Sequence, residues 1–203
     1  MKKTFAIFFV ALFFASLPIK AQESQKANEA RKFIEEIGNK IIKTAGEKNL
    51  SETQKKDKII TIIDNTTDND WIARFVLGKN YKNSTESQKE RFTKLYRGFM
   101  INTYGPKFKN YDGKKFTVNE VNEKNSFFIV KAEFLPKDSN VPISVDFRVK
   151  ERDGKLAILD FIAEGVSLIE TQRSEFNSAI AQKGMDKFLN DLGERVEKLK
   201  AAK

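Results

Sequence analysis

The stretch VPISVDFRVKERDGKLAILDFIA, residues 141–163, determines the fold class predicted for this chain. Its first half alternates between apolar and polar side chains, which is typical of a β-strand with one wet face. The apolar positions are Val141, Ile143, Val145, Phe147 and Val149. Asp153-Gly154 then predicts a tight hairpin turn into residues 155–163. Because this second strand has little polar surface on either side, we expect it to be central in its sheet.

Two further strands precede this hairpin, at residues 115–121 and 127–135. On both sides of the four strands, apolar residues recur at steps of three and four, which predicts amphipathic helices. The expected helices are residues 23–46, a segment that begins at Ser51, a short helix that starts at Asp68 or Asp70 and stops at Gly78, a long helix that starts at Ser84 or Thr85 and reaches Tyr104, and two segments after Gly165. This segregation predicts an α+β domain, with helices packed on one face of an antiparallel, curved sheet of about four strands.

The first 21 residues are expected to form a signal peptide. Lys2 and Lys3 precede an uncharged run from Phe5 to Leu17, which is shorter than the roughly 20 residues of a membrane span. An uncleaved N-terminal anchor is the alternative. Cleavage after Ala21 would leave residues 22–203 as a single domain exported to the periplasm. Its formal charge would be +6 instead of the +9 of the whole chain, because Lys2, Lys3 and Lys20 would leave.

The chain contains no His and no Cys. Their absence excludes a Ser-His-Asp triad, a thiol nucleophile, a thiolate zinc site and a structural disulfide. We predict no metal and no cofactor, and the remaining chemistry is binding or that of carboxylate, Lys and Tyr side chains. The lysines are interleaved with acidic residues and form no Arg-rich cluster, so the positive charge does not indicate nucleic-acid binding. It favours a weak attraction to anionic lipid surfaces or to an acidic partner.

Asp160 lies within the apolar second strand of the hairpin, where a carboxylate is costly unless it is paired. With a two-residue turn, it should lie opposite Phe147 and share a face with Ile158 and Ile162. One interpretation is a general base with a raised pKa, as in an isomerase built on a cone-shaped α+β sheet. The favoured interpretation is a buried acceptor tied to an Arg, a Tyr hydroxyl or backbone amides, because no second catalytic group stands at a readable spacing.

Aromatic residues are concentrated in two of the predicted helices and in the strands. They are Trp71, Phe75, Tyr81, Phe92, Tyr96, Phe99, Tyr104, Phe128, Phe134 and Phe147. An ordinary core and the wall of a lipid-sized cavity use the same residue types. The periodicity alone therefore leaves both interpretations open.

Two blocks of sequence resemble the MlaC family, the toluene-tolerance auxiliary components of ABC transporters. The first block is Phe75-Val76-Leu77-Gly78, followed by Tyr81-Lys82, Ser84, Gln88, Phe92, Phe99, Tyr104-Gly105 and Phe108-Lys109-Asn110-Tyr111-Asp112-Gly113. The second is DFIAEGVSLI at residues 160–169, followed by Arg173, Phe176, Ile180, Gly184, Asp186 and Leu192. Two positions depart from the family pattern, since Tyr81 stands where many members have Trp and Gln172 where many have Tyr.

The resemblance implies a periplasmic phospholipid carrier that serves the lipid asymmetry of the outer membrane. Its fold would enclose a hydrophobic lipid cavity between the sheet and the helices. The implied partners are phospholipid, an inner-membrane ABC transporter complex with an MCE-domain subunit, and an outer-membrane complex of lipoprotein and porin. We expect a monomer. The candidate wall residues, taken from inward periodicity near the matched blocks, are Phe75, Phe92, Leu95, Tyr96, Phe99, Met100, Val145, Phe147, Val149, Ile158, Ile162, Val166 and Ile169.

Two alternatives stay open at this point. In one, the protein is an adaptor or chaperone that recognises protein partners through its Lys-rich helices and carries no lipid. In the other, it is an enzyme in which Asp160 acts on a hydrophobic substrate.

Overall fold

The structure, a computed structural model, describes residues 24–105 and 113–201. The expected signal peptide and the family match at residues 108–112 lie outside these ranges. The helices are α1 (Gln25–Ala45), α2 (Glu52–Thr66), α3 (Asn69–Leu77), α4 (Lys79–Asn83), α5 (Glu86–Tyr104), α6 (Leu168–Lys183) and α7 (Met185–Ala201). The strands are β1 (Gly113–Lys124), β2 (Phe127–Pro136), β3 (Ile143–Arg152), β4 (Lys155–Ala163) and β5 (Val166–Ser167).

Side-chain caps begin the helices where the sequence predicts them. Ser51 and Thr85 each form a complete capping box with a glutamine three residues later. Asp68, one of two candidate start positions for α3, accepts a hydrogen bond from the backbone N–H of Trp71 at 2.9 Å. The one-turn helix α4 was not predicted, because Gly78 breaks the helical period in front of it.

The five strands form one antiparallel sheet in the order β1-β2-β3-β4-β5. This arrangement confirms the predicted α+β class. The prediction that residues 155–163 form a central strand is confirmed, because β4 has β3 on one side and β5 on the other. On the β5 side the described residues provide only this two-residue strand and an isolated parallel bridge from Thr67 to Ile158. The apolar character of β4 has a further cause, because α2, α3 and α6 pack against it.

The register of β4 also differs from the prediction. Asp160 lies opposite Arg148, not Phe147, because the pairing shifts between Arg148 and Val149. The extra residue of this β-bulge moves every later side chain of β4 to the other face of the sheet. Asp160 therefore does not share a face with Ile158.

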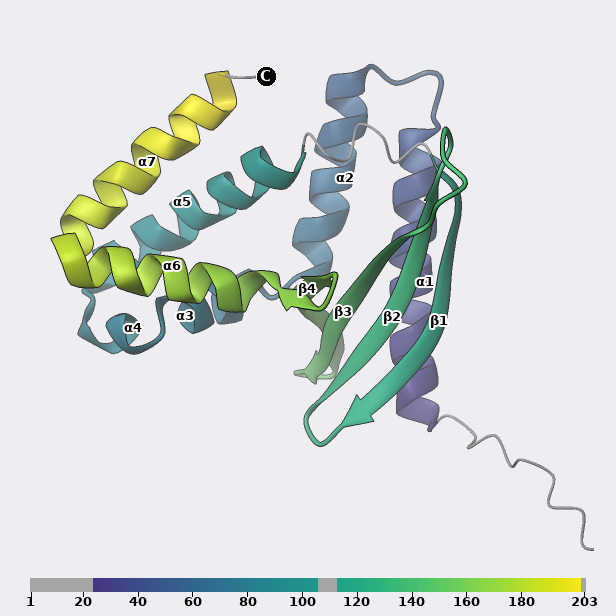
Figure 1. Cartoon of the computed structure of the whole chain (residues 1–203), viewed down its shortest axis with the longest axis horizontal. Helices are drawn as coiled ribbons and strands as arrows, with labels where there is room; N and C mark the ends of the chain where they lie inside the picture. The colour runs from purple at the N-terminus through teal and green to yellow at the C-terminus, as the bar shows by residue number, and fades with distance from the viewer. Residues whose placement is uncertain (1–23, 106–112, 202–203) are drawn as a thin grey trace, which may run out of the picture.

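Figure 1 shows α3 to α7 gathered on one side of the molecule and the sheet with α1 and α2 on the other. Each side has its own hydrophobic core. On the sheet side, α1 packs on β1 and β2, and Gly38 of α1 lies so close to Phe116 that an added Cβ would come within 2.2 Å of the ring. On the helical side, α3, α5, α6 and α7 surround Phe92 and Phe176. Among the described residues, the two cores have no buried residue in common.

Candidate functional site

The face of the sheet that packs against α1 is apolar across all five strands, and we call it the inner face. Cross-strand partners in an antiparallel sheet share a face. One inner-face row crosses the whole sheet and consists of Val118, Ala132, Val145, Ala163 and Val166. Val118 and Ala132 are buried, Val145 is half-buried, Ala163 is exposed, and Val166 keeps 60% of its surface exposed. We call this set the inner row.

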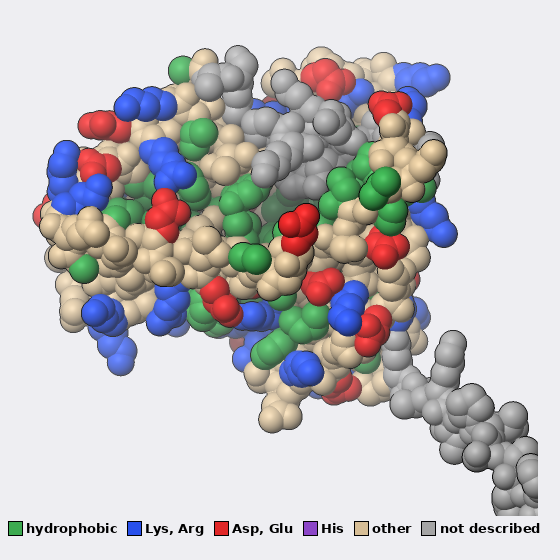
Figure 2. Space-filling model, viewed as in Figure 1, with side chains coloured by type: hydrophobic (Ala, Val, Ile, Leu, Met, Phe, Trp, Pro, Cys, Tyr) green, Lys and Arg blue, Asp and Glu red, His purple; other side chains and the backbone are tan. Residues whose placement is uncertain are grey.

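Along the inner row the apolar side chains pass from buried, at Val118 and Ala132, to exposed, at Ala163 and Val166. A neighbouring row follows the same trend, because Phe134 is buried while its partner Ile143 is 50% exposed. Figure 2 shows the surface hollowed between the helical side and the sheet, with hydrophobic side chains in the hollow. An apolar sheet face therefore continues from a packed core into an uncovered region.

The other face of the sheet is polar. Glu120, Lys131 and Asp146 lie side by side on it, and Lys131 pairs with Glu120 at 2.8 Å. Asp146 lies opposite Ile162, so Ile162 belongs to this outer face. Burial is the main cause that raises the pKa of Asp146 above its usual value.

The wall candidates fall into three groups. Phe75, Phe92, Leu95, Tyr96, Phe99, Met100 and Ile169 belong to or pack against the core of the helical side. Val145, Phe147, Val149 and Ile158 belong to or pack against the core beneath the inner face. Val166 ends the exposed part of the inner row, whereas Ile162 lies on the opposite face. The structure thus divides most of them between the two hydrophobic cores, and it places Ile162 on the other face of the sheet.

Aromatic stacking fills the helical core. Phe92 stacks on Tyr96 with ring centroids 5.5 Å apart, and both rings meet Phe176 edge-on at 6.2 Å. On the sheet side, Phe147 meets Phe161 edge-on at 5.5 Å. Rings packed in this way leave little of their surface free, so they form part of the hydrophobic cores.

Gln172 is a buried polar residue within the helical core, with 3% of its surface exposed. Its Oε1 accepts a hydrogen bond from the Tyr96 hydroxyl, and its Nε2 lies 3.2 Å from the Met100 sulfur. Burial raises the pKa of Tyr96 far above its ordinary value, so its hydroxyl stays protonated and remains a donor. Gln172 therefore holds α6 against α5 through polar contacts with Tyr96 and Met100.

Asp160 is completely buried and holds the start of α6. Its carboxylate accepts hydrogen bonds from the Ser167 hydroxyl at 2.6 Å and from the backbone N–H of Ile169 at 3.2 Å. Arg148 lies at 3.8 Å. Burial raises the pKa of the Asp160 carboxyl, and these three partners oppose that shift. Asp160 is thus a buried acceptor tied to an Arg and a backbone amide, as the favoured interpretation predicted, and Ser167 takes the place of a Tyr hydroxyl.

Arg173 joins the two sequence blocks that carry the family resemblance. Its Nη1 donates to the carbonyl oxygen of Phe75 at 2.7 Å, and its guanidinium lies 4.7 Å from the centre of the Phe75 ring. Asn177, one turn further along α6, donates to the carbonyl oxygen of Val76 at 2.9 Å. Both side chains donate to carbonyl oxygens in the last turn of α3, and the Phe75 carbonyl also accepts a bond from the backbone N–H of Gly78 at 3.1 Å.

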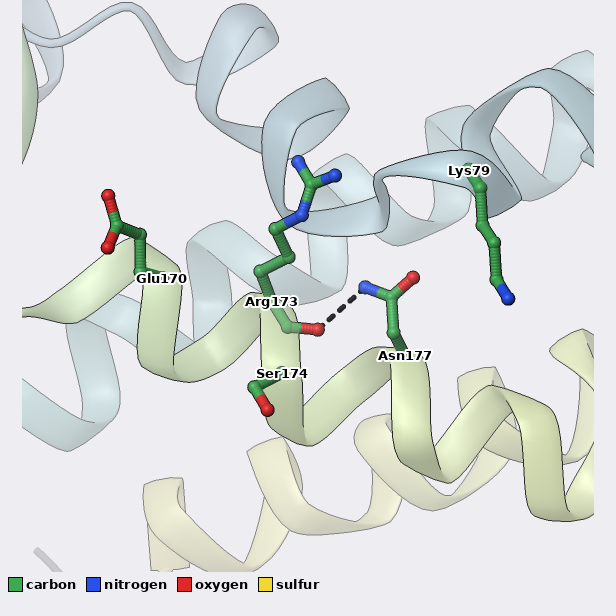
Figure 3. Close-up of a pocket in the computed structure, with 5 residues that line it drawn as sticks. All are labelled: Lys79, Glu170, Arg173, Ser174 and Asn177. Atoms are coloured by element: carbon green, nitrogen blue, oxygen red, sulfur yellow. Dashed lines mark hydrogen bonds between the residues drawn. The ribbon is translucent and has the colours of Figure 1, made fainter.

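The same residues border an open pocket of about 360 Å³ on the helical side. Figure 3 shows its lining residues, which are Lys79, Glu170, Arg173, Ser174 and Asn177. All five are polar or charged, so this pocket is unsuited to acyl chains. It was not predicted from the sequence, because it arises where α6 meets the unpredicted helix α4.

The described residues contain no cluster of three or more acidic, His or Cys side chains that could hold a metal ion. Within the same part of the chain, no helix has the length and apolar character to cross a membrane.

The family model described as "MlaC protein" matches residues 24–194. The chain belongs to the MlaC family. A curated MlaC relative from Haemophilus influenzae, named as the binding protein of an intermembrane phospholipid transport system, is 22% identical over 121 residues. That alignment covers 58% of this chain and 56% of the relative, so the chain spans little more than half of the relative's length.

A solved structure shares the MlaC-type fold. It is a phospholipid-binding protein from Ralstonia solanacearum in complex with a phospholipid, with a TM-score of 0.75 and 18% sequence identity. The superposition covers 84% of this chain and 98% of that protein. The match establishes the fold of the MlaC chain described above.

Sequence reasoning missed several inner-face residues of this MlaC chain. Val118, Ala132 and Ala163 belong to the inner row but were not among the wall candidates. The first two lie at alternating positions in their strands, so the period of β1 and β2 could have identified them. Ala163 could not be found in this way, because the bulge reverses the alternation of β4 before it.

Proposed function

We propose that the mature chain, residues 22–203, is a periplasmic phospholipid carrier. It would shuttle lipid between the outer membrane and an inner-membrane ABC transporter of the Mla type. The observation that carries the proposal is the inner row, which stays apolar as it leaves the packed core and becomes exposed at Val166. Membership of the MlaC family supports the proposal, as do a relative named for intermembrane phospholipid transport and a fold neighbour with bound phospholipid.

The energetics of acyl chains indicate what such a site must achieve. Removing acyl chains from water gains about 0.8 kcal/mol per CH₂, so two chains with some thirty methylenes gain on the order of 24 kcal/mol. A bilayer offers nearly the same gain. A carrier therefore competes with the membrane only if its walls are as apolar as hydrocarbon, and the apolar side chains of the inner row support the proposal in this respect.

The proposed ligand site consists of the wall candidates on the inner face and in the helical core, together with Ala163. Ile162 is excluded from this wall because it lies beside Asp146. The phospholipid would be the ligand, without a further cofactor. The MCE-domain transporter complex and the lipoprotein and porin complex would be the partners, and the carrier would act as a monomer.

The contacts of Asp160 favour a carrier over an enzyme. A general base needs a free lone pair aimed at a substrate, whereas the Asp160 oxygens are engaged by Ser167 and Ile169. We therefore assign Asp160 a structural role in fixing α6 against β4.

Phospholipid transfer between vesicles tests the proposal. Donor vesicles would carry a self-quenched fluorescent phospholipid, and acceptor vesicles would be unlabelled. Mature protein should raise the transfer rate in proportion to its concentration, and the recovered lipid should be chemically unchanged. A rate equal to that of vesicles alone would support the adaptor alternative, and lipid breakdown products would support the enzyme alternative.

A further inference from the structure

Helix α2 lies on the sheet side of the molecule, next to α1 (Figure 1). It packs on α1 and β4, and Ile59 is its only fully buried residue. Ile60 and Ile63 are half-buried and belong to neither hydrophobic core. Two large apolar side chains of α2 are thus only partly covered.

Helix α5, which lies next to α2, also has an apolar residue that is only partly covered. Most of its apolar side chains join the helical core, but Ile101 is half-buried and belongs to neither core. The polar contacts show that α2 and α5 run in opposite directions. Arg97 of α5 binds Asp64 of α2, and a Cβ on Gly105 would lie 3.9 Å from Cε of Lys56. Ile60 lies between Lys56 and Asp64 in the chain, and Ile101 lies between Arg97 and Gly105.

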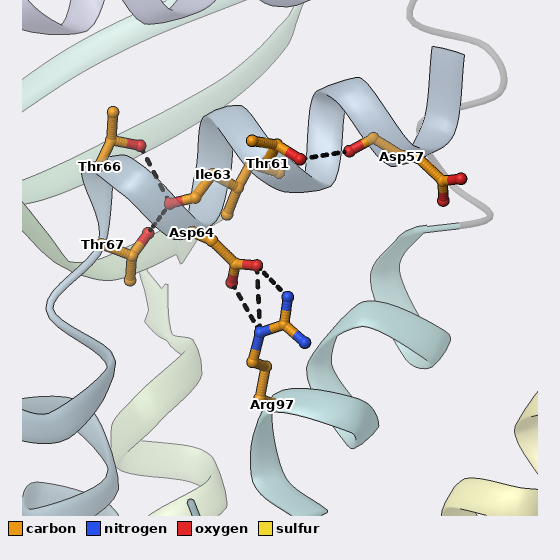
Figure 4. A network of polar contacts seen from close by, with 7 residues as sticks. All are labelled: Asp57, Thr61, Ile63, Asp64, Thr66, Thr67 and Arg97. Carbon is orange, nitrogen blue, oxygen red and sulfur yellow. Dashed lines mark hydrogen bonds and ion pairs between the residues drawn. The ribbon is translucent and has the colours of Figure 1, made fainter. Parts of the chain in front are cut away.

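We call the boundary between these two helices the α2–α5 seam, with Ile60, Ile63 and Ile101 as its apolar residues and Asp64 and Arg97 as its ion pair. Figure 4 shows the Asp64 carboxylate and the Arg97 guanidinium meeting between the helices. Arg97 Nε lies 3.2 Å from Oδ1 and 3.1 Å from Oδ2, and Nη2 contacts Oδ2 as well. The pair is therefore a forked contact with defined geometry.

The last turn of α2 is fixed so that Asp64 points at α5. The Thr67 hydroxyl donates to the Ile63 carbonyl oxygen at 2.7 Å, and the Thr66 hydroxyl donates to the Ile62 carbonyl oxygen at 2.8 Å. These bonds lie at the C-terminal end of α2, and Figure 4 shows the bond from Thr67 to Ile63. The carboxylate thus has a well-supported position, although half of the Arg97 side chain is exposed.

The two sides of the molecule are joined much more firmly elsewhere. Asp160 binds the start of α6, Arg152 pairs with Asp68 at 2.6 Å, and the backbone N–H of Asp68 donates to the Ile158 carbonyl oxygen at 3.1 Å. These contacts include backbone hydrogen bonds and a fully buried carboxylate. The contact between α2 and α5 is weaker than these. It relies on a partly exposed ion pair, whose attraction is screened by solvent, and on isoleucines that are only half-buried.

We propose that the α2–α5 seam is the passage through which acyl chains reach the space between the sheet and the helical core, and that the Asp64–Arg97 pair closes it. This inference rests on the proposed function. An acyl chain requires an apolar path, which the three isoleucines supply. Closing the pair covers that path, and opening it separates α2 from α5 while the β4–α6 junction holds the two sides together.

A cross-linking experiment tests the passage. Because the chain contains no Cys, the double variant Asp64→Cys/Arg97→Cys carries two unique thiols that a short bismaleimide can join. The mature protein would first be loaded with labelled phospholipid and then cross-linked. Release to excess unlabelled vesicles should fall about tenfold or more, whereas the amount of bound lipid should stay unchanged.

Two further variants sharpen the test. Glu47→Cys/Lys58→Cys replaces an ion pair with a 3.3 Å contact on the sheet side, and its cross-link should leave the release rate unaltered. Asp64→Asn, which weakens the closing pair, should speed release several-fold at unchanged lipid content. If the cross-linked Asp64→Cys/Arg97→Cys protein holds lipid yet releases it at the uncross-linked rate, the passage lies elsewhere and the inference fails. If no variant and no wild-type protein acquires lipid, the proposed function fails as well.

Discussion

Arg173 on α6 donates a hydrogen bond to the carbonyl oxygen of Phe75, the third-last residue of α3, at 2.7 Å. The two residues are 98 positions apart in the chain and belong to the two sequence blocks that resemble the MlaC family. Their contact joins these two blocks in the folded chain. The chain must turn sharply after α3 so that its last carbonyls face α6, and Gly78 makes this turn at φ +56° and ψ −125°.

Replacing Gly78 by alanine should disturb this junction. The backbone conformation at Gly78 is one that L residues rarely adopt, and an added Cβ would lie 3.0 Å from the Arg173 guanidinium. We expect Gly78→Ala to lower the free energy of unfolding by about 1–3 kcal/mol, measured by urea denaturation. Gly193→Ala is the matched control. It lies inside α7 with the nearest side-chain atom 3.7 Å from the new Cβ, so it should be neutral or stabilise by up to about 1 kcal/mol. Equal effects of the two changes would contradict this view of the turn.

A second prediction separates the two faces of the sheet. Ala163→Asp places a charge at the exposed part of the inner row, whereas Ile162→Asp places the same charge on the adjacent outer face. The inner-face variant should lose most of its co-purifying phospholipid, because an unpaired carboxylate cannot lie against acyl chains. The outer-face variant should keep its lipid. Lipid phosphate per mole of folded protein measures both.

Phe147→Asp would be a less selective probe of the same wall. Phe147 is buried in the sheet core against Phe161, so a charge there should also unfold much of the protein. The Ala163 and Ile162 pair avoids this problem, since Ala163 is exposed and Ile162 only half-buried. If Ala163→Asp retains its lipid, or if only Ile162→Asp loses lipid, the lipid wall does not lie on the inner face but on the outer one.

A third prediction concerns pH and Asp160. Burial raises its pKa in the folded protein above the usual 3.8, so the folded state binds this proton more tightly than the unfolded state. The contribution of Asp160 to the free energy of unfolding should therefore fall as the pH rises from about 3.8 through the folded pKa. The free energy of unfolding of wild type minus that of Asp160→Asn should therefore also fall as the pH rises. Wild type should compare most favourably with the variant at low pH. Denaturation curves at several pH values test this, and a difference that moves the opposite way would contradict it.

Much of the fold could be predicted from local sequence signals. The alternation in β3 and the caps at Ser51, Thr85 and Asp68 are encoded within a few residues, and the structure confirms them. The surroundings of β4 could not be predicted in this way. Its apolar residues indicated a central strand, but they did not show that one neighbour has only two residues or that helices from distant parts of the chain bury it.

The candidate site was less accessible to sequence reasoning. Helical periodicity correctly selected inward residues such as Phe92 and Phe99, but it does not distinguish a core from a cavity wall. In β4, a single extra residue near Leu159 reversed the faces of Asp160 and Ile162 relative to the simple register. A bulge has no sequence signature comparable to a turn or a cap, so that error follows from the physics of strand pairing.

Organic extraction and native mass spectrometry of purified mature protein test the central claim most directly. The mass of the folded protein should exceed that of the chain by the mass of phospholipid, and extraction should recover intact phospholipid in stoichiometric amounts. The Ala163→Asp variant, purified in parallel, should lose this added mass, whereas Ile162→Asp should retain it. A wild-type protein that is folded, monomeric and free of lipid would contradict the carrier account.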